Sequence, residues 1–150
     1  MPLEHLCLTF GFSKRNHLIE FTDGGKNVDS IHIRNTEKYG RGVFALHDIK
    51  EDEFIEEAPV IVIPKKEWKK MKYSVLMNYI FWWGKDKAIA LGYGSLYNHS
   101  FNPNAYYLTN IENDSIDFYA GRDIQKGEEI LINYNGDPED QSPIWFDVIE

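Results

Sequence analysis

Two short polar elements of this chain combine side chains that could bind and orient a ligand. The first, SLYNHSFNPNA at residues 95–105, is too polar for a core strand and too ordered in composition for a generic loop. The second, KGEEILINY at residues 126–134, ends on Tyr134. A phenol has a pKa near 10, so it stays protonated at neutral pH and can orient polar groups without adding a charge. A GRG turn at residues 40–42 precedes both elements.

The Asn-His-Ser run at residues 98–100 admits three interpretations besides ligand binding. One is a turn rich in Asn and Pro, whose side chains cap their own backbone. A second is a Ser-His hydrolase pair, but adjacent His99 and Ser100 would point to opposite faces of an extended chain. The third is a metal site, and His99 has no His or Cys at ligand spacing nearby. The hydrolase and metal interpretations are therefore disfavoured.

Two glycine pairs are ambiguous when taken alone. Gly40-Arg41-Gly42 comes just before a probable strand, where glycine allows unusual dihedrals or a close approach to a ligand. A tight turn explains the same pattern. Gly92 and Gly94 pose the same question, and no strand–GxGxxG–helix arrangement indicates a dinucleotide site.

Together, the GRG turn, the polar motif and the tyrosine strand resemble those of the SET-domain protein lysine methyltransferases, in the same order. The resemblance is to the small, zinc-free, stand-alone members, and it spans residues 31–145. It implies transfer of a methyl group from S-adenosylmethionine to a lysine amine, which must be unprotonated and aligned with the methyl carbon and sulfur. The motif match is complete at Asn98, His99, Ser100, Pro103 and Asn104.

The same resemblance carries an expected architecture. It implies a mainly β fold with minor α, made of several short sheets, in which the C-terminal strand threads a loop in a knot-like way. Residues 1–150 would form a single SET domain with its core at 31–134. The remaining segment, 135–150, would cover the cofactor and the substrate channel. The zinc-binding flanks of many histone methyltransferases are missing, so no metal is expected.

Roles for individual residues follow from the resemblance. Tyr134 would be catalytic by orienting the amine, and Tyr107 would be a second tyrosine of the lysine channel. If Tyr107 lines that channel, its hydroxyl takes space that further methyl groups need, which predicts mainly monomethyl-lysine; a core or surface aromatic is the competing interpretation. The residues implied to bind the cofactor are Gly40, Arg41, Gly42, Tyr97, Asn98, His99 and Trp145.

Composition limits the partners and the compartment. Twenty-four acids against sixteen bases give a net charge of −8, which argues against direct nucleic-acid binding and favours a basic substrate such as a histone tail. Cys7 is the only cysteine, so no intrachain disulfide is expected. Residues 1–12 make a poor signal peptide, and no apolar run could span a membrane. We therefore expect an intracellular protein, cytoplasmic or nuclear; stand-alone members of the family can pair as homodimers.

Two other functional classes remain open. One is a catalytically weak SET-like module that binds cofactor or peptide without turnover, although retention of Tyr134 argues against it. The other is an unrelated β-rich interaction domain whose motifs are only turns and core aromatics.

Short β-rich segments separated by turns must position these motifs. Alternating or β-branched runs predict strands. The segment 65–77 is predicted to be a helix, because apolar residues recur at helical spacing: Trp68, Met71, Val75 and Leu76. Residues 79–83 and 87–91 suggest a hairpin with a three-residue loop, Gly84–Asp86. The other predicted strands are 30–34, 42–46, 54–63, 105–109, 116–120 and 129–134.

Two further features of the strands stand out. Glu56 and Glu57 interrupt an apolar strand and must face opposite ways, so either could meet the peptide or the cofactor. An internal echo indicates two similar strand-turn-strand units packed in one domain, although it is too short to establish a duplication. Its members are Ala45, Asp48, Ile49, Glu53 and Ile55, which recur 75 positions later as Ala120, Asp123, Ile124, Glu128 and Ile130.

Overall fold

A computed structural model describes residues 30–37 and 40–148. Within these residues nine short strands form three sheets, and helical structure is limited to two single turns. The predictions about residues 1–12 and Cys7 fall outside the described part of the chain. In the described part, no helix has both the length and the apolar character needed to cross a bilayer.

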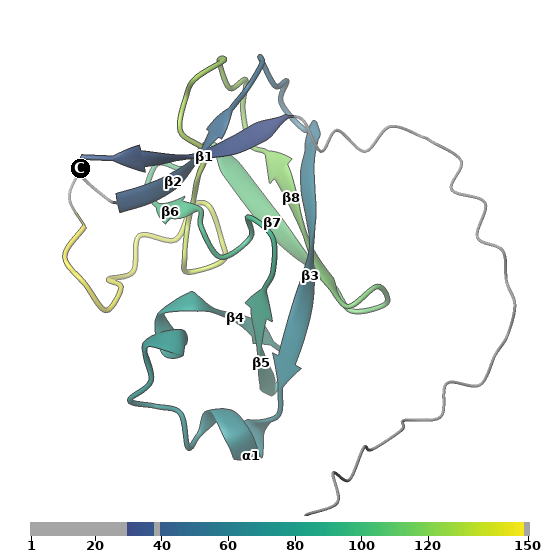
Figure 1. Ribbon diagram of the computed structural model, residues 1–150, viewed down its shortest axis with the longest axis vertical. Coiled ribbons are helices and arrows are strands. Elements are labelled where there is room, and N and C mark those ends of the chain that lie inside the picture. Colours follow the sequence, from purple (N-terminus) through teal and green to yellow (C-terminus); the bar gives the residue numbers. More distant parts are fainter. Residues whose placement is uncertain (1–29, 38–39, 149–150) are drawn as a thin grey trace, which may run out of the picture.

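The three sheets differ in size and direction (Figure 1). β1 (Ile31–Thr36) and β2 (Gly40–Ala45) form an antiparallel hairpin, and a five-stranded antiparallel sheet has the order β4-β5-β3-β8-β7. The third sheet is the parallel pair β6-β9, made by Asn98–His99 and Leu131–Ile132. The long sheet is built from β4 (Ile80–Trp83), β5 (Asp86–Ala90), β3 (Phe54–Ile63), β8 (Ser115–Ala120) and β7 (Ala105–Asn110).

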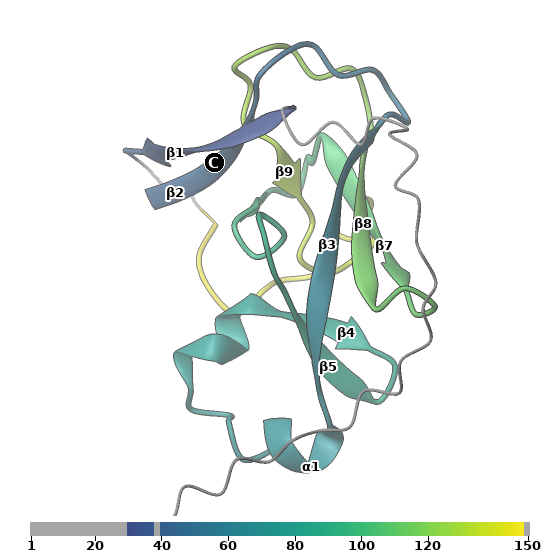
Figure 2. The ribbon, with the colours of Figure 1, turned by 45° about the vertical axis from the view of Figure 1, so that its right-hand side comes forward.

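One apolar core lies between these sheets, as expected for short strands that each bury one face. Figure 2 shows β9 between the β1-β2 hairpin and the long sheet, and Ile132 of β9 belongs to the core. Every strand of the long sheet contributes to this core, and so do the loops between β2 and β3 and between β8 and β9. Among its fully buried members are Val43, Ile49, Ala58, Phe118, Ile124 and Ile130. The mainly β fold with minor α is thus confirmed.

The predicted helix over Lys65–Met77 is wrong. Only α1 (Lys65–Trp68) is helical, and a separate 3-10 turn, η1, spans Val75–Tyr79. None of the residues in α1 is buried, so no packing stabilises a longer helix. Lysines four residues apart repel one another along this segment. The Ser74 hydroxyl then accepts a hydrogen bond from the amide of Leu76 (3.3 Å) and begins the new turn.

The predicted hairpin exists, but its loop is shorter than expected. Trp83 of β4 pairs with Asp86 of β5, which leaves a two-residue loop of Gly84 and Lys85. Gly84 has φ +58°, a conformation that glycine adopts without strain, so the hairpin can close in two residues.

The two halves of the internal echo pack against each other. Ile49 and Ile124 exchange both main-chain hydrogen bonds, each 2.9 Å long. The Asp48 carboxylate accepts from the amide of Lys126 (2.8 Å), and Asp123 accepts from the equivalent amide of Glu51 (3.0 Å). The two loops are therefore related by a local twofold axis, which explains why their sequences repeat the same residue types.

The segment around β9 is inserted between β2 and the polar motif. The amide of Ile130 donates to the carbonyl of Val43 (2.8 Å), and the amide of Leu131 donates to Oδ1 of Asn104 (2.8 Å). The polar motif makes a second bond to this segment, in which the amide of Ser100 donates to the carbonyl of Ile132 (3.0 Å). The ladder is shorter than the strand predicted over residues 129–134, because side-chain and loop bonds replace regular pairing there.

Candidate active site

Asn98 joins the GRG turn to the element that carries Tyr134. Its side-chain amide donates to the carbonyl oxygen of Arg41 (3.1 Å) and to Oε1 of Glu129 (2.7 Å). Three segments that are remote in sequence therefore meet at one side chain. Glu129 was not singled out from the sequence. Its place in the element that ends at Tyr134 was the one signal that could have marked it as a site residue.

The two glycines of the GRG turn are required for different structural reasons. Gly40 has φ +76°, in the region that favours glycine. A Cβ atom on Gly42 would lie 3.0 Å from Nδ2 of Asn98 and closer still to Oε1 of Glu129. A side chain at position 42 would therefore displace the Asn98 bonds.

His99 braces the tyrosine strand through its imidazole. Nδ1 of His99 accepts a hydrogen bond from the amide of Tyr134 (3.1 Å), and the two ring centroids lie 5.2 Å apart. The side chain is buried, with 6% of its surface exposed. The polar motif and Tyr134 are thus locked together by a side-chain bond as well as by the β6-β9 pairing.

The Tyr134 hydroxyl is fixed and neutral. It donates to the carbonyl oxygen of Tyr97 at 2.8 Å. Burial, with smaller contributions from Tyr79 and Glu129, raises the pKa of Tyr134 to about 12. The phenol therefore keeps its proton at neutral pH, and its oxygen lone pairs remain able to accept a hydrogen bond.

Tyr97 faces the site with its main chain and the core with its side chain. Its hydroxyl donates to Oε2 of Glu56 (2.9 Å), and its ring lies 4.5 Å from that of Phe118. Burial, and then the neighbouring Glu56 carboxylate, raises the pKa of Tyr97 well above its usual value. The group that Tyr97 offers to Tyr134 is its carbonyl oxygen.

Tyr107 and its neighbour lie on opposite faces of β7. Tyr107 packs edge-on against Phe81, with ring centroids 5.1 Å apart, and lines the same cavity as Tyr134. Burial raises the pKa of Tyr107 to about 12. Tyr106 stacks on Tyr119 at 5.6 Å, away from that cavity.

Trp145 and Phe146 close over Tyr134 from the C-terminal segment. Trp145 is 59% exposed and stacks on the Tyr134 ring at 5.9 Å, with an interplanar angle of 18°. Phe146 lies edge-on to His99 at 6.3 Å. Phe146 adjoins Trp145 in the segment 135–150 that was expected to cover the cofactor, where Trp145 was the residue chosen for that role.

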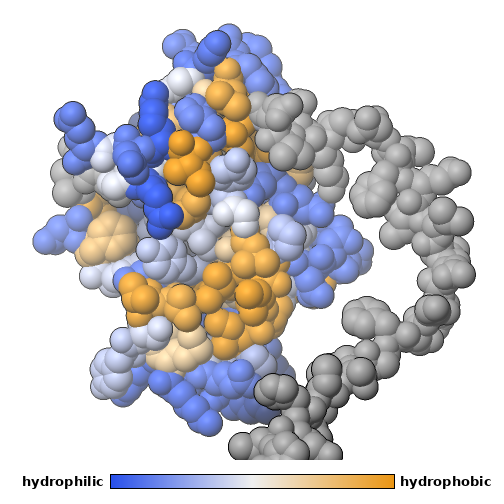
Figure 3. Space-filling model, viewed as in Figure 1, coloured by the Kyte–Doolittle hydropathy of each residue, from blue (hydrophilic) through white to orange (hydrophobic). Residues whose placement is uncertain are grey.

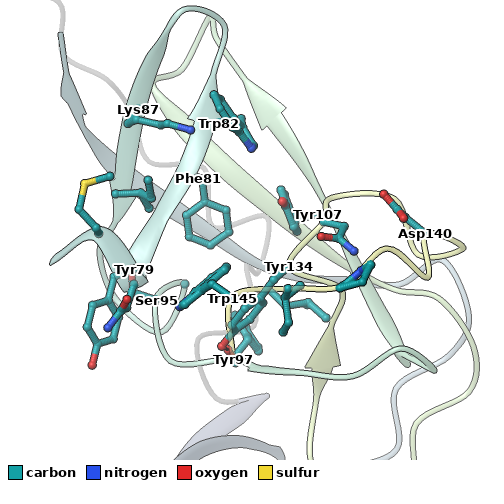
Figure 4. Close-up of a pocket in the computed structure, with 18 residues that line it drawn as sticks. Tyr79, Phe81, Trp82, Lys87, Ser95, Tyr97, Tyr107, Tyr134, Asp140 and Trp145 are labelled. Atoms are coloured by element: carbon teal, nitrogen blue, oxygen red, sulfur yellow. Dashed lines mark hydrogen bonds between the residues drawn. The ribbon is translucent and has the colours of Figure 1, made fainter. Parts of the chain in front are cut away.

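Two cavities meet at Tyr134. The first, of about 380 Å³, is lined by Phe81, Tyr107 and residues of the C-terminal segment, as Figure 4 shows. The second, of about 550 Å³, is lined by Arg41, Asn98, His99 and Phe146. Six residues line both cavities: Asn78, Tyr79, Ser95, Tyr97, Tyr134 and Trp145. Sequence reasoning missed Asn78 and Tyr79, because neither belongs to a distinctive motif: Asn78 follows the predicted helix, and Tyr79 begins the strand predicted over residues 79–83.

Apolar side chains gather beside the cavities, over η1 and the β4-β5 hairpin (Figure 3). Val75 and Leu76 of η1 and Leu91 after β5 are among the exposed apolar residues of this region. Since η1 also lines both cavities, an apolar surface adjoins their rim.

Comparison with known proteins decides the family. The sequence model of the SET domain matches residues 40–135, which is more than half of the chain. The chain belongs to the SET-domain family of protein lysine methyltransferases. The unrelated interaction domain is therefore excluded.

Other SET-domain proteins are similar over most of the chain. A Schizosaccharomyces pombe histone-lysine N-methyltransferase specific for H3 lysine-37 is 40% identical, over 78% of this chain and 77% of that protein. A Saccharomyces cerevisiae histone-lysine N-methyltransferase specific for H3 lysine-36 is 32% identical over 88% of this chain, which spans only 19% of that relative. A crystal structure of a candidate histone methyltransferase from Plasmodium falciparum is 38% identical, with a TM-score of 0.61, over 70% of this chain and 92% of the other.

Proposed function

We propose that the protein transfers a methyl group from S-adenosylmethionine to a lysine amine of a basic protein segment, such as a histone H3 tail. The observation that carries this proposal is the Tyr134 hydroxyl, held by Tyr97 where two cavities meet. A methyl transferase needs such a junction, because donor and acceptor must approach one another in line from separate binding sites.

The second cavity fits the cofactor. Its volume of about 550 Å³ lies within the usual range for small-molecule sites. The absent side chain at Gly42 leaves room for the Asn98 and Glu129 bonds at its wall. We infer that Gly40, Arg41, Gly42, Asn98 and His99 hold S-adenosylmethionine with the main chain at Tyr97, and that Trp145 and Phe146 cover it. When bound, this cofactor supplies a methyl group activated by a positively charged sulfur.

The first cavity suits the side chain of a target lysine. Its walls include Phe81, Tyr107, Tyr134 and Trp145. An aromatic, poorly hydrated channel disfavours an ammonium ion and so lowers the pKa of a lysine inside it. The amine can then lose its proton to water before transfer, so the reaction needs no strong base from the protein.

The Tyr134 hydroxyl would orient the neutral amine. Its proton is directed at the carbonyl of Tyr97, so its oxygen can accept a hydrogen bond from the amine. That bond leaves the nitrogen lone pair to point toward the methyl donor. Because the pKa of Tyr134 is raised to about 12, the phenol does not act as a base at neutral pH.

A basic peptide matches the charge of the protein. The net charge is −8, and residues 135–148 include four acids and no lysine or arginine. Asp140 lines the first cavity, and Asp147 lines the second. The names of the yeast relatives specify lysines 36 and 37 of histone H3, which supports a histone tail as the substrate to test first.

Transfer of a labelled methyl group from S-adenosylmethionine to recombinant histones tests the proposal. We expect labelling by the wild type and a loss of at least about 100-fold in kcat for Tyr134→Phe, because the orienting hydroxyl is removed. Tyr106→Phe, on the other face of β7, is the matched control and should retain activity. Calorimetric binding of the cofactor without transfer to any protein of a cell extract would instead identify a binding module.

A further inference from the structure

The segment from Gly92 to Tyr97 leads directly into the polar motif and ends at the carbonyl that accepts from Tyr134. That bond is 2.8 Å long. The direction of the Tyr134 hydroxyl therefore depends on where this segment holds the Tyr97 carbonyl. Contacts outside the polar motif must therefore hold this segment in place.

Glu56 of β3 holds the segment at two points. Its Oε1 accepts from the main-chain amide of Tyr93 (2.9 Å), and its Oε2 accepts from the hydroxyl of Tyr97 (2.9 Å). The pairing of β3 with β8 shifts register between Phe54 and Glu56. A β-bulge of this kind changes the direction of nearby side chains, and here Glu56 points inward toward residues 93 and 97.

Two glycines bring the segment against β3. Gly92 has φ +65°, and a Cβ atom on it would lie 2.7 Å from Oε1 of Glu56. A Cβ atom on Gly94 would lie 2.7 Å from the methyl groups of both Ala58 and Ala90. The Gly92-x-Gly94 pattern, ambiguous in the sequence, thus allows the close approach that places both donors within reach of one carboxylate.

The position is an unusual one for a carboxylate. Burial raises the pKa of Glu56, although the bonds from Tyr93 and Tyr97 act in the opposite direction. Among the residues that the structure describes, no cation forms an ion pair with Glu56. In the described part of the chain, these two hydrogen bonds are what compensates the Glu56 carboxylate for its lost hydration. A carboxylate whose described hydrogen bonds both come from this segment is suited to fixing it.

We propose that Glu56 is a positioning residue for methyl transfer. By holding the Tyr93 amide and the Tyr97 hydroxyl, it fixes the Tyr97 carbonyl and, through that carbonyl, the Tyr134 hydroxyl. The proposal rests on the function proposed above, in which Tyr134 orients the amine. Glu56 lines neither of the two cavities, so it would act through Tyr97 and not by direct contact.

Steady-state kinetics of Glu56→Gln and Tyr97→Phe test this role. The amide of Gln has one acceptor oxygen, so it can satisfy only one of the two donors, and Phe removes the other partner without changing the ring packing. We expect kcat to fall by about tenfold in each variant, with the peptide KM and the cofactor Kd within about twofold of the wild type. Glu57→Gln, the neighbouring acid on β3, should leave kcat unchanged.

The double variant provides the decisive comparison. If Glu56 acts through Tyr97, Glu56→Gln combined with Tyr97→Phe should lose no more kcat than the more impaired single variant. Hydrogen exchange of the peptide covering residues 92–98 should also be faster in Glu56→Gln, a readout that does not need activity. Wild-type kcat in both single variants, or additive losses in the double variant, would overturn the proposal. An inactive wild type would instead overturn the proposed function, and with it this role.

Discussion

The Tyr107 and Tyr134 hydroxyls lie in the same cavity but have different surroundings. The Tyr134 hydroxyl donates to a carbonyl, whereas burial among Phe81 and Phe118 is what raises the pKa of Tyr107. An oxygen atom in that wall takes space that additional methyl groups on a lysine would need. The two tyrosines are therefore expected to control different properties: the rate and the product.

Tyr107→Phe should raise the methylation state of the product while retaining activity. Removing the hydroxyl enlarges the channel by about one oxygen atom, so a monomethyl-lysine product can be methylated again. Mass spectrometry of a histone peptide after long incubation measures the ratio of mono-, di- and trimethyl-lysine. Tyr106→Phe is the control, because Tyr106 stacks on Tyr119 outside the cavity. Unchanged product ratios in Tyr107→Phe would contradict the prediction.

Among individual site residues, the sequence could identify those that act through their side chains. Asn98, His99 and Tyr134 could be singled out because their residue types and order are distinctive. The role of the Tyr97 main chain could not, since a carbonyl is common to all residues. The direction of Glu56 was also undecidable, because strand alternation leaves open which of two neighbouring acids faces inward.

Among the elements, β5 contains an unusual buried cation. Lys87 is 4% exposed, its ammonium lies over the ring of Trp82, and the ring of Trp68 is 5.4 Å away. Burial lowers the pKa of Lys87 to about 8. The unfolded chain therefore binds this proton more tightly than the folded protein does.

Lys87→Met should stabilise the protein at pH 7. We expect a gain of about 1 kcal/mol in the free energy of unfolding, because the faces of Trp82 and Trp68 offset only part of the cost of burying the ammonium. Since wild-type stability rises as the pH increases from about 8 to 10.5, the advantage of the variant should shrink over that window. Urea unfolding at several pH values measures it, with the exposed Lys85→Met as the control. A pH-independent difference would contradict this account.

The local twofold axis between the two loops pairs a strained residue with an unstrained one. Asp52 has φ +63° and is exposed, and its counterpart 75 positions later is Gly127, with φ +83°. Only glycine adopts such a conformation without cost. The same turn therefore costs more backbone conformational energy at Asp52 than at Gly127.

Asp52→Gly should therefore stabilise the fold, and Gly127→Ala should destabilise it. We expect shifts of about 0.5–1 kcal/mol in opposite directions, because a side chain with positive φ is strained and glycine is not. No atom lies within 4 Å of a Cβ on Gly127, so the effect of Ala would be conformational and not steric. Urea unfolding measures both variants. Equal stability of Gly127→Ala and the wild type would argue against the explanation.

The strands were predicted better than the helix, because the strands have partners to pair with and the helical segment has no surface to pack on. Strands with β-branched and aromatic runs, such as Phe54–Ile63, begin and end where the sequence indicates. The helix over Lys65–Met77 failed because helical spacing alone does not supply a surface to pack on. The β6-β9 pair escaped notice as a parallel sheet, since two-residue strands are defined by their partners and not by their own sequence.

For the whole molecule, the net charge of −8 should govern encounter with a basic substrate. Raising the salt concentration from about 50 to 300 mM shortens the range of this attraction, so the peptide KM should rise several-fold while kcat stays constant. Neutralising Asp137 and Glu139 together should flatten the dependence, because both belong to the acidic C-terminal segment. Steady-state kinetics over a salt series measures the effect. A KM that does not change with salt would show that charge is not what selects the substrate.

The insertion of β9 between β2 and the polar motif has a consequence for biogenesis. A ribosome must release the chain as far as Tyr134 before the catalytic junction can form, even though the GRG turn leaves the exit tunnel about ninety residues earlier. Until then, the motif loop and the edge of β2 that does not face β1 present unpaired backbone, a condition in which nascent β-proteins are prone to aggregate. Pairings that close over such distances also form slowly. The candidate site is thus expected to assemble late, only after the chain up to Tyr134 has emerged.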